Sequence, residues 1–234
     1  PESSGGLALD GTGTLRVLPR PIVVTADNQT KQYGDEHALG DTGFTVTLGD
    51  DPDDTDSVTF SGAALLSGET IDSVLLTSTG AAASENAGIY SINASNASGN
   101  AEFNPSNYDI SYVSGDLTVE KLDVLITADD QSKTYGETIG LSGDFSFVVD
   151  DADSDLNGKA FLPNGDSIAL ASVSLSSAGT SGDVGVANYA ITATGNASTT
   201  NYNFTYASGD LTVTPRPLQL NVADQETMYG SGAS

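Results

Sequence analysis

The residues of this chain that could do chemistry are concentrated in two acid-rich segments, 50–57 and 150–158. Carboxylates at alternate positions of a loop can converge on one hard cation, and Asp153-x-Asp155-x-Asn157-Gly158 follows the opening half of a calcium loop. Calcium is therefore the one cofactor that the sequence suggests. Its candidate ligands are Asp51, Asp53, Asp151, Asp153, Asp155 and Asn157.

The calcium pattern is incomplete in both segments. Asn164 stands where a bidentate glutamate should close the second loop, with Asp166 two residues beyond it, and the first segment has no glycine in register. A solvated acidic turn that keeps neighbouring units apart by charge is the simpler interpretation. Both interpretations stay open at this point.

Catalytic chemistry has little support in the sequence. Cysteine is absent and His37 is the one histidine. His37 aligns with Ile139 or a near neighbour in a second copy of the surrounding sequence, so it is not a repeated catalytic base. Nucleophilic triads and histidine-ligated metals are thereby excluded for a repeated site, and we predict no catalytic residue and no enzyme activity.

Lys31 and Lys133 stand at equivalent places, which raises the idea of an intramolecular isopeptide bond. A third copy has Thr227 at this position, and that break argues against the bond. A lysine whose stem packs on apolar surface while its ammonium reaches water is the preferred interpretation.

All of these residues lie in an internal repeat, and the fold of that repeat must position them. The segment Ala26–Gly34 returns as Ala128–Gly136 and, shortened, as Ala223–Gly230, while Asn107–Val119 returns as Asn201–Val213. Repetition at this spacing indicates a tandem array of domains. We predict repeats at 20–120 and 121–215, the last strand of a preceding repeat in 1–19, and the start of a third repeat in 216–234.

The apolar residues of each repeat alternate with polar ones in short runs rich in β-branched and aromatic residues. Such runs predict half-buried strands. They are Ile22–Thr25, Phe44–Leu48, Val124–Thr127, Phe145–Val149 and Tyr189–Thr192. The predicted fold is all-β, in the form of small β-grasp-like or immunoglobulin-like sandwich modules, with one short helix per repeat around 69–76 and 166–173.

The junction between the repeats has no flexible spacer. Residues 117–127 run from one predicted strand to the next without glycine, proline or a serine-rich stretch. Modules joined in this way should be arranged end to end in a stiff rod.

The tyrosines recur at matching places in the copies, which favours a structural role over a ligand-stacking one. Large rings at fixed positions of a small β domain are expected to fill its core, with each hydroxyl finding a polar partner. The matched sets are Tyr33 with Tyr135 and Tyr229, Tyr90 with Tyr189, Tyr108 with Tyr202, and Tyr112 with Tyr206. The glycine after Tyr33 should supply a positive φ in a turn.

Charge limits the partners of the chain. It has 32 acidic and 7 basic residues and a formal net charge of −25. A surface this negative repels phosphate backbones and anionic lipid, so we expect neither nucleic acid binding nor direct membrane insertion. The partners that the repeat itself suggests are neighbouring repeats of the same polypeptide.

The repeat resembles the MBG domain of the YGX type, found in long bacterial surface and secreted adhesins. Three motifs carry the resemblance: Ala-Asp followed by Lys-x-Tyr-Gly in 26–34, Gly-x-Tyr-x-Ile in 88–92, and the closing Asn-Tyr-x-Ile-x-Tyr-x-x-Gly-x-Leu-Thr-Val in 107–119. The second repeat departs from the middle motif, with Val186-Ala187-Asn188 before its tyrosine.

The resemblance implies an extracellular or cell-surface location and a role as stalk repeats of an exported adhesin that attaches cells to surfaces or builds a biofilm. The alternative is that the repeats bind a glycan or a protein directly. The partners that the resemblance implies, beyond neighbouring repeats, are an extracellular polysaccharide or a surface receptor. Phe60, Phe103 and Phe161 are the aromatic residues that such a binding module would use.

Overall fold

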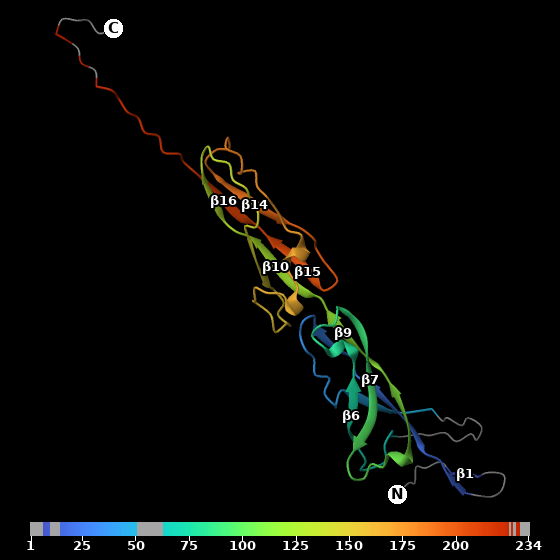
Figure 1. Ribbon diagram of the computed structural model, residues 1–234. Helices are drawn as coiled ribbons and strands as arrows, with labels where there is room; N and C mark the ends of the chain where they lie inside the picture. Colours follow the sequence, from blue (N-terminus) through green and yellow to red (C-terminus); the bar gives the residue numbers. More distant parts are fainter. Residues whose placement is uncertain (1–6, 10–14, 51–62, 225, 227, 230–234) are drawn as a thin grey trace. The chain divides into compact units, whose positions relative to one another are not determined.

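A computed structural model describes residues 7–9, 15–50, 63–224, 226, 228 and 229 of the chain (Figure 1). Over these residues the fold is all-β, with short 3-10 turns and no α-helix, and two similar pairs of sheets follow one another. The all-β prediction is therefore confirmed. The chain divides into two compact units: the first comprises Pro1–Leu125, Phe147–Ser172 and Asn196–Thr205, and the second comprises Ile126–Ser146, Val173–Gly195 and Tyr206–Ser234.

The first repeat folds into one sheet of order β5-β3-β8 and another of order β4-β9-β7-β6. Its strands are β3 (Arg20–Ala26), β4 (Gln29–Gln32), β5 (Phe44–Leu48), β6 (Ile71–Thr77), β7 (Gly88–Gly99), β8 (Tyr108–Val113) and β9 (Gly115–Glu120). The antiparallel pair β1 (Leu7–Leu9) and β2 (Leu15–Val17) precedes them. Because β3 pairs with β8 and β4 with β9 in parallel, both sheets differ from the antiparallel sheets of an immunoglobulin sandwich.

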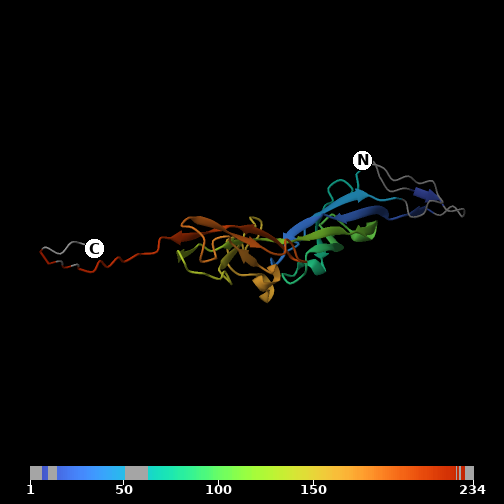
Figure 2. The ribbon, with the colours of Figure 1, turned by 90° about the horizontal axis from the view of Figure 1, so that it is seen from above.

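The second repeat reproduces this topology, with sheets of order β12-β10-β15 and β11-β16-β14-β13. Its strands are β10 (Leu122–Ala128), β11 (Gln131–Thr134), β12 (Phe145–Val149), β13 (Ser174–Ser176), β14 (Asn188–Thr194), β15 (Tyr202–Ala207) and β16 (Gly209–Thr214). Strand β11 runs parallel to β16, as β4 does to β9. Beyond Thr214 the described residues form no strand, and Figure 2 shows them as an extended trace.

The most strongly repeated motifs lie where the chain passes from one sheet to the other. Residues 27 and 28 connect β3 to β4, and the Asn28 side-chain oxygen accepts a hydrogen bond from the Asp116 backbone N–H at 2.8 Å. Asp130 accepts from Asp210 at the same distance in the second repeat. Gly115 is required because a Cβ there would lie 2.5 Å from the Ala26 carbonyl oxygen. The repeated motifs therefore form the crossing between the sheets.

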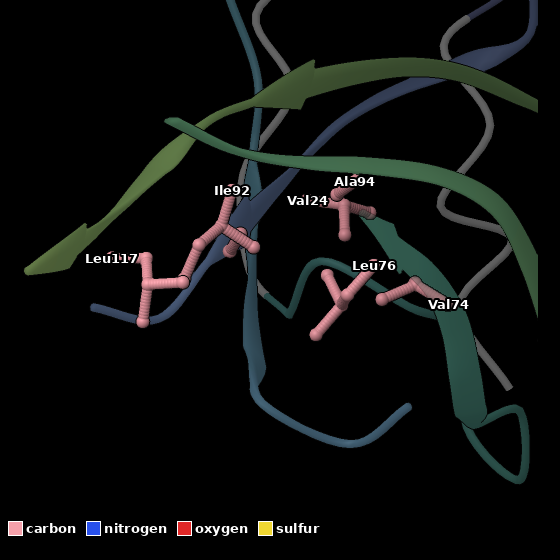
Figure 3. Close-up of a cluster of buried hydrophobic side chains, with 7 residues drawn as sticks. Val24, Val74, Leu76, Ile92, Ala94 and Leu117 are labelled. Atoms are coloured by element: carbon pink, nitrogen blue, oxygen red, sulfur yellow. The ribbon is translucent and has the colours of Figure 1, made fainter. Parts of the chain in front are cut away.

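The core of the first repeat lies between its two sheets (Figure 3). It is formed by alternate residues of several strands: Val24, Ala26, Val74, Leu76, Ile92, Ala94 and Leu117. The corresponding cluster of the second repeat contains Ala128, Ile191, Ala193 and Leu211. Complete burial of one such aliphatic side chain contributes about 1.5–3 kcal/mol, so these alternating positions supply much of the stability of each repeat.

The prediction of helices was wrong for 69–76 and correct only in part for 166–173. The first segment contains β6, in which Val74 and Leu76 are buried while Leu75 is exposed. Burial of every second residue is the pattern of a strand. In the sequence this pattern was obscured by Gly68 and Glu69, which resemble the start of a helix. The second segment contains a 3-10 turn, Ile168–Ala171, capped by the Ser167 hydroxyl. Among the described residues, no helix has the length and apolarity needed to span a membrane.

Candidate functional site

The Tyr-Gly pair of each repeat forms a tight turn directly after the short parallel strand β4 or β11. Gly34 has a φ of +93° and Gly136 a φ of +92°. A residue with a Cβ is disfavoured in this region of backbone space, which explains the glycine. The tyrosine is fixed by its backbone: the Tyr33 N–H donates to the Glu120 carbonyl and the Tyr135 N–H to the Thr214 carbonyl, each at 2.9 Å.

The two equivalent tyrosines have very different environments. Tyr33 is 3% exposed, whereas Tyr135 is 44% exposed. Within the first unit, the Tyr33 ring packs edge-on against Tyr202, with 5.5 Å between ring centroids and 85° between planes. The Tyr33 hydroxyl donates to the Asp166 carboxylate at 3.0 Å, and the Tyr202 hydroxyl donates to the same oxygen at 2.7 Å. Tyr33 is therefore buried by residues of the following repeat.

Further polar contacts surround this tyrosine pair. The Asn201 side chain accepts from the Ala87 N–H at 2.9 Å and donates to the Asn86 side chain at 2.8 Å. The Asn164 side chain donates to the Ala83 carbonyl at 3.0 Å. The Pro163 ring packs so closely on the turn that a Cβ at position 34 would lie 2.6 Å from it. We call Tyr33, Asp166, Tyr202 and these neighbours the tyrosine junction.

The prediction that all the tyrosines fill cores needs correction. It is confirmed for Tyr108 and Tyr202, which are almost fully buried, whereas Tyr33 is buried at the contact with the following repeat. It is wrong for Tyr112 and Tyr135, which are 39% and 44% exposed; Tyr229 lies in the short third copy, whose described residues form no strand. Recurrence in each copy showed that these residues are structural, but it did not distinguish a contact inside one repeat from a contact between two.

Burial raises the pKa of both hydroxyls at the junction. For Tyr202, loss of solvation is the largest cause, and the hydrogen bond to Asp166 and the charge of that carboxylate add to it. For Tyr33, loss of solvation is again the largest cause; a hydrogen bond with Asn164 acts against it, and Asp166 adds to the rise in the pKa. Ionisation of either tyrosine would place a second negative charge beside the Asp166 carboxylate.

We therefore expect the chain to lose stability above pH 10. A folded-state pKa raised above the unfolded value of 10.0 gives stability that is complete below pH 10 and falls as the pH rises above it. Tyr202→Phe removes one of these groups, so its melting temperature should fall less steeply than that of the parent chain between pH 9 and 11. Thermal melts at matched ionic strength measure the two slopes, and equal slopes would refute the linkage.

Lys31 and Lys133 are buried, which contradicts the expected exposure of their ammonium groups. They are 7% and 4% exposed. The Lys31 ammonium donates to the backbone carbonyls of Asp35, at 3.0 Å, and Ala82, while that of Lys133 donates to the carbonyls of Glu137, at 2.9 Å, and Ser181. Loss of solvation lowers the pKa of Lys31, against the opposing charge of Asp35. Each lysine thus ties the Tyr-Gly turn to the loop before β7 or β14.

The predicted calcium ligands are only partly described by the structure. Asp51 and Asp53 lie outside the described residues. Asp151 is 8% exposed, and its carboxylate accepts hydrogen bonds from the backbone N–H groups of Asp123, at 3.3 Å, and Asp153, at 3.1 Å. These bonds give Asp151 a structural role at the loop, and its burial differs from the solvated carboxylate that the simpler interpretation assumed.

The remaining ligand candidates lie close to Asp151 along the chain. The Asn157 N–H donates to the Ser154 carbonyl at 3.1 Å. Burial is the main cause that raises the pKa of Asp35, and the charges of Asp155 and Asp151 add to it, against a hydrogen bond from Ser154. In the parts of the chain that the structure describes, no three acidic or histidine side chains are arranged to hold a metal ion.

Calcium binding therefore remains a prediction, and one feature makes it worth testing. Asp151 and Asp153 line an open hollow of about 620 Å³ together with Gln32, whose buried side-chain oxygen has no hydrogen-bond partner. If calcium binds there, the melting temperature should rise in millimolar calcium and fall with a chelator, and Asp153→Asn should reduce the difference. Superimposable melts with and without chelator would show that calcium does not stabilise the folded chain.

Comparison with known proteins agrees with the repeat structure. The profile of the MBG domain (YGX type) matches residues 22–118 and again 124–212. A search for similar curated proteins gave no match. MBG domains are non-catalytic repeat modules that occur in surface or secreted bacterial proteins. The chain therefore belongs to the MBG domain (YGX type) family and carries two of its domains in tandem.

Proposed function

We propose that these MBG domains are stalk repeats of a large exported bacterial adhesin, which hold an adhesive region away from the cell for attachment to surfaces or within a biofilm. The observation that best supports this role is the connection between the domains. Lys121 alone separates the last strand of the first domain, β9, from the first strand of the second, β10. A connection of one residue leaves little freedom for the domains to swing.

Two further features suit a stalk. The tyrosine junction adds side-chain contacts beside the covalent connection, including the hydrogen bond from the Asn201 side chain to the Asn86 side chain at 2.8 Å. The net charge of −25 keeps separate chains, and repeats far apart in one chain, from associating. A stalk needs both a fixed connection between neighbours and repulsion between all other surfaces.

Small-angle X-ray scattering on the chain tests the proposal. The maximum dimension should be close to twice that of one domain, and the profile should be that of a stiff rod. A control chain with a flexible Gly-Ser insertion after Lys121 should give a broader distribution of distances. If the parent chain scatters as a compact particle, or as flexibly as the control, the stalk proposal fails.

Direct recognition of a glycan or protein is the alternative, and one exposed aromatic residue favours it. Phe161 is 54% exposed, whereas Phe103 is buried and stacks on Tyr108 with 5.4 Å between ring centroids. Phe60 lies outside the described residues. If the domains bind glycans through Phe161, a glycan array should give a signal that Phe161→Ala removes, and a silent array would count against this alternative.

A further inference from the structure

A hollow at the start of the first repeat has the chemistry of one half of the tyrosine junction. It measures about 230 Å³ and is lined by residues 17–20 together with Leu66, Ser106, Asn107 and Tyr108. Leu66 is 39% exposed and Val17 70% exposed, so apolar surface faces this space. A cavity of about 150 Å³ can hold a benzene molecule, so the hollow is large enough for an aromatic ring.

Several residues in or next to the wall of the hollow occupy the places of residues that surround Tyr33. Tyr108 corresponds to Tyr202, and its hydroxyl donates to the Glu69 carboxylate as that of Tyr202 donates to Asp166. In the segments Leu65–Ile71 and Leu162–Ile168, Leu66 and Glu69 stand where Pro163 and Asp166 stand. Asn107 stands where Asn201 stands, next to the tyrosine.

We propose that this hollow is the receptor for the Tyr-Gly turn of an MBG domain that directly precedes Arg20 on the same polypeptide. The incoming tyrosine ring packs on Tyr108, its hydroxyl donates to Glu69, and its glycine lies against Leu66. Each contact repeats one that Tyr33 and Gly34 make with Tyr202, Asp166 and Pro163. The proposal deepens the stalk function, on which it rests, by naming the contact that fixes one domain to the next.

The position of the hollow explains why the occupant belongs to the same polypeptide. Residues 17–19 form part of its wall and correspond to Val119–Lys121 at the observed junction. There the Tyr33 N–H donates to the carbonyl of Glu120, and Leu18 stands at the place of Glu120. A donor domain must therefore end in the strand that leads into Leu18.

The second domain carries an uncovered copy of the donor. Tyr135 has the backbone bond and the following positive-φ glycine of Tyr33, yet it is 44% exposed. One MBG domain thus has a donor turn at one end and a receptor at the other. Such a pair of unlike surfaces lets an array grow by repetition of a single contact.

A duplicated chain tests the proposal: residues 1–213 followed directly by residues 18–234, joined at Val213 because it corresponds to Val17. Ser132→Thr in the first half marks its Tyr135 peptide by mass, with a residue that the first repeat already has at this place, Thr30. Hydroxyl-radical footprinting with mass spectrometry then compares the oxidation rate of Tyr135 in the two halves. Protection of Tyr108 in both halves checks that the domains are folded.

We expect Tyr135 of the first half to be oxidised as slowly as Tyr33, and Tyr135 of the second half to stay reactive. Leu66→Lys in the second half places a charge in the receptor and should restore the reactivity. Equal rates in the two halves would overturn the proposal, and so would protection that survives Leu66→Lys. Scattering from the original chain is independent of this result, so a docking failure is distinguishable from a failure of the stalk function.

Discussion

Tyr33→Ala should lower the free energy of unfolding by about 3 kcal/mol, at the lower end of the cost of truncating a buried aromatic side chain. Tyr33 is 3% exposed, and its truncation removes both the edge-on ring contact with Tyr202 and a hydrogen bond to Asp166. The cavity would lie between residues of two successive domains. The substitution should therefore weaken the junction as well as the domain that carries it.

Tyr135→Ala is the matched control, because it makes the same chemical change at the equivalent residue. With Tyr135 44% exposed, its truncation should cost less than about 1 kcal/mol. Urea unfolding followed by tyrosine fluorescence measures both variants, since the chain contains nine tyrosines and no tryptophan. Equal losses of stability in the two variants would show that Tyr33 acts only inside its own repeat.

Gly115→Ala should destabilise the first domain by about 3 kcal/mol, at the upper end of the cost of overpacking. A Cβ at this position would lie 2.5 Å from the carbonyl oxygen of Ala26 and 2.9 Å from that of Asp27. Both atoms are backbone, so no side chain can rotate away to make room. The two chain segments that cross between the sheets would have to separate at the point where Asn28 holds them together.

Gly140→Ala is the control for the glycine substitution, because nothing lies within 4 Å of a Cβ at that position. It should leave the stability unchanged or raise it by about 0.4–1 kcal/mol through a smaller loss of backbone entropy. Circular dichroism melts of the two variants give the comparison. A Gly115→Ala chain that melts with the parent would mean that the sheet crossing tolerates side chains.

Local patterns in the sequence predicted the strands well. Phe44–Leu48 and Phe145–Val149 are strands over their full predicted length, because alternation of apolar and polar residues directly reflects the two faces of a sheet. Segment 69–76 was assigned to the wrong class, since Gly68 and Glu69 resemble the start of a helix while the alternation of Val74 and Leu76 is short. Parallel pairing of β4 with β9 depends on contacts distant in sequence, which periodicity does not report.

The tyrosine junction was only half visible in the sequence. Recurrence marked Tyr33 as structural, but Tyr33 and Tyr135 have the same local sequence and differ only in what covers them. A signal was present in the closing motif. The pair Asn107-Tyr108 recurs as Asn201-Tyr202, and this second copy lies at the contact with the first domain. The buried lysines were missed for a related reason: their partners are backbone carbonyls, which carry no sequence signature.

The most direct test of a fixed connection between the domains is a distance distribution between spin labels. Because the chain has no cysteine, Ser91→Cys and Ala190→Cys place one label at equivalent exposed positions of the two domains. Electron–electron double resonance should give one narrow distance distribution, which Tyr33→Ala broadens and Tyr135→Ala leaves unchanged. A broad distribution in the parent chain would contradict a stalk whose domains are held by the tyrosine junction.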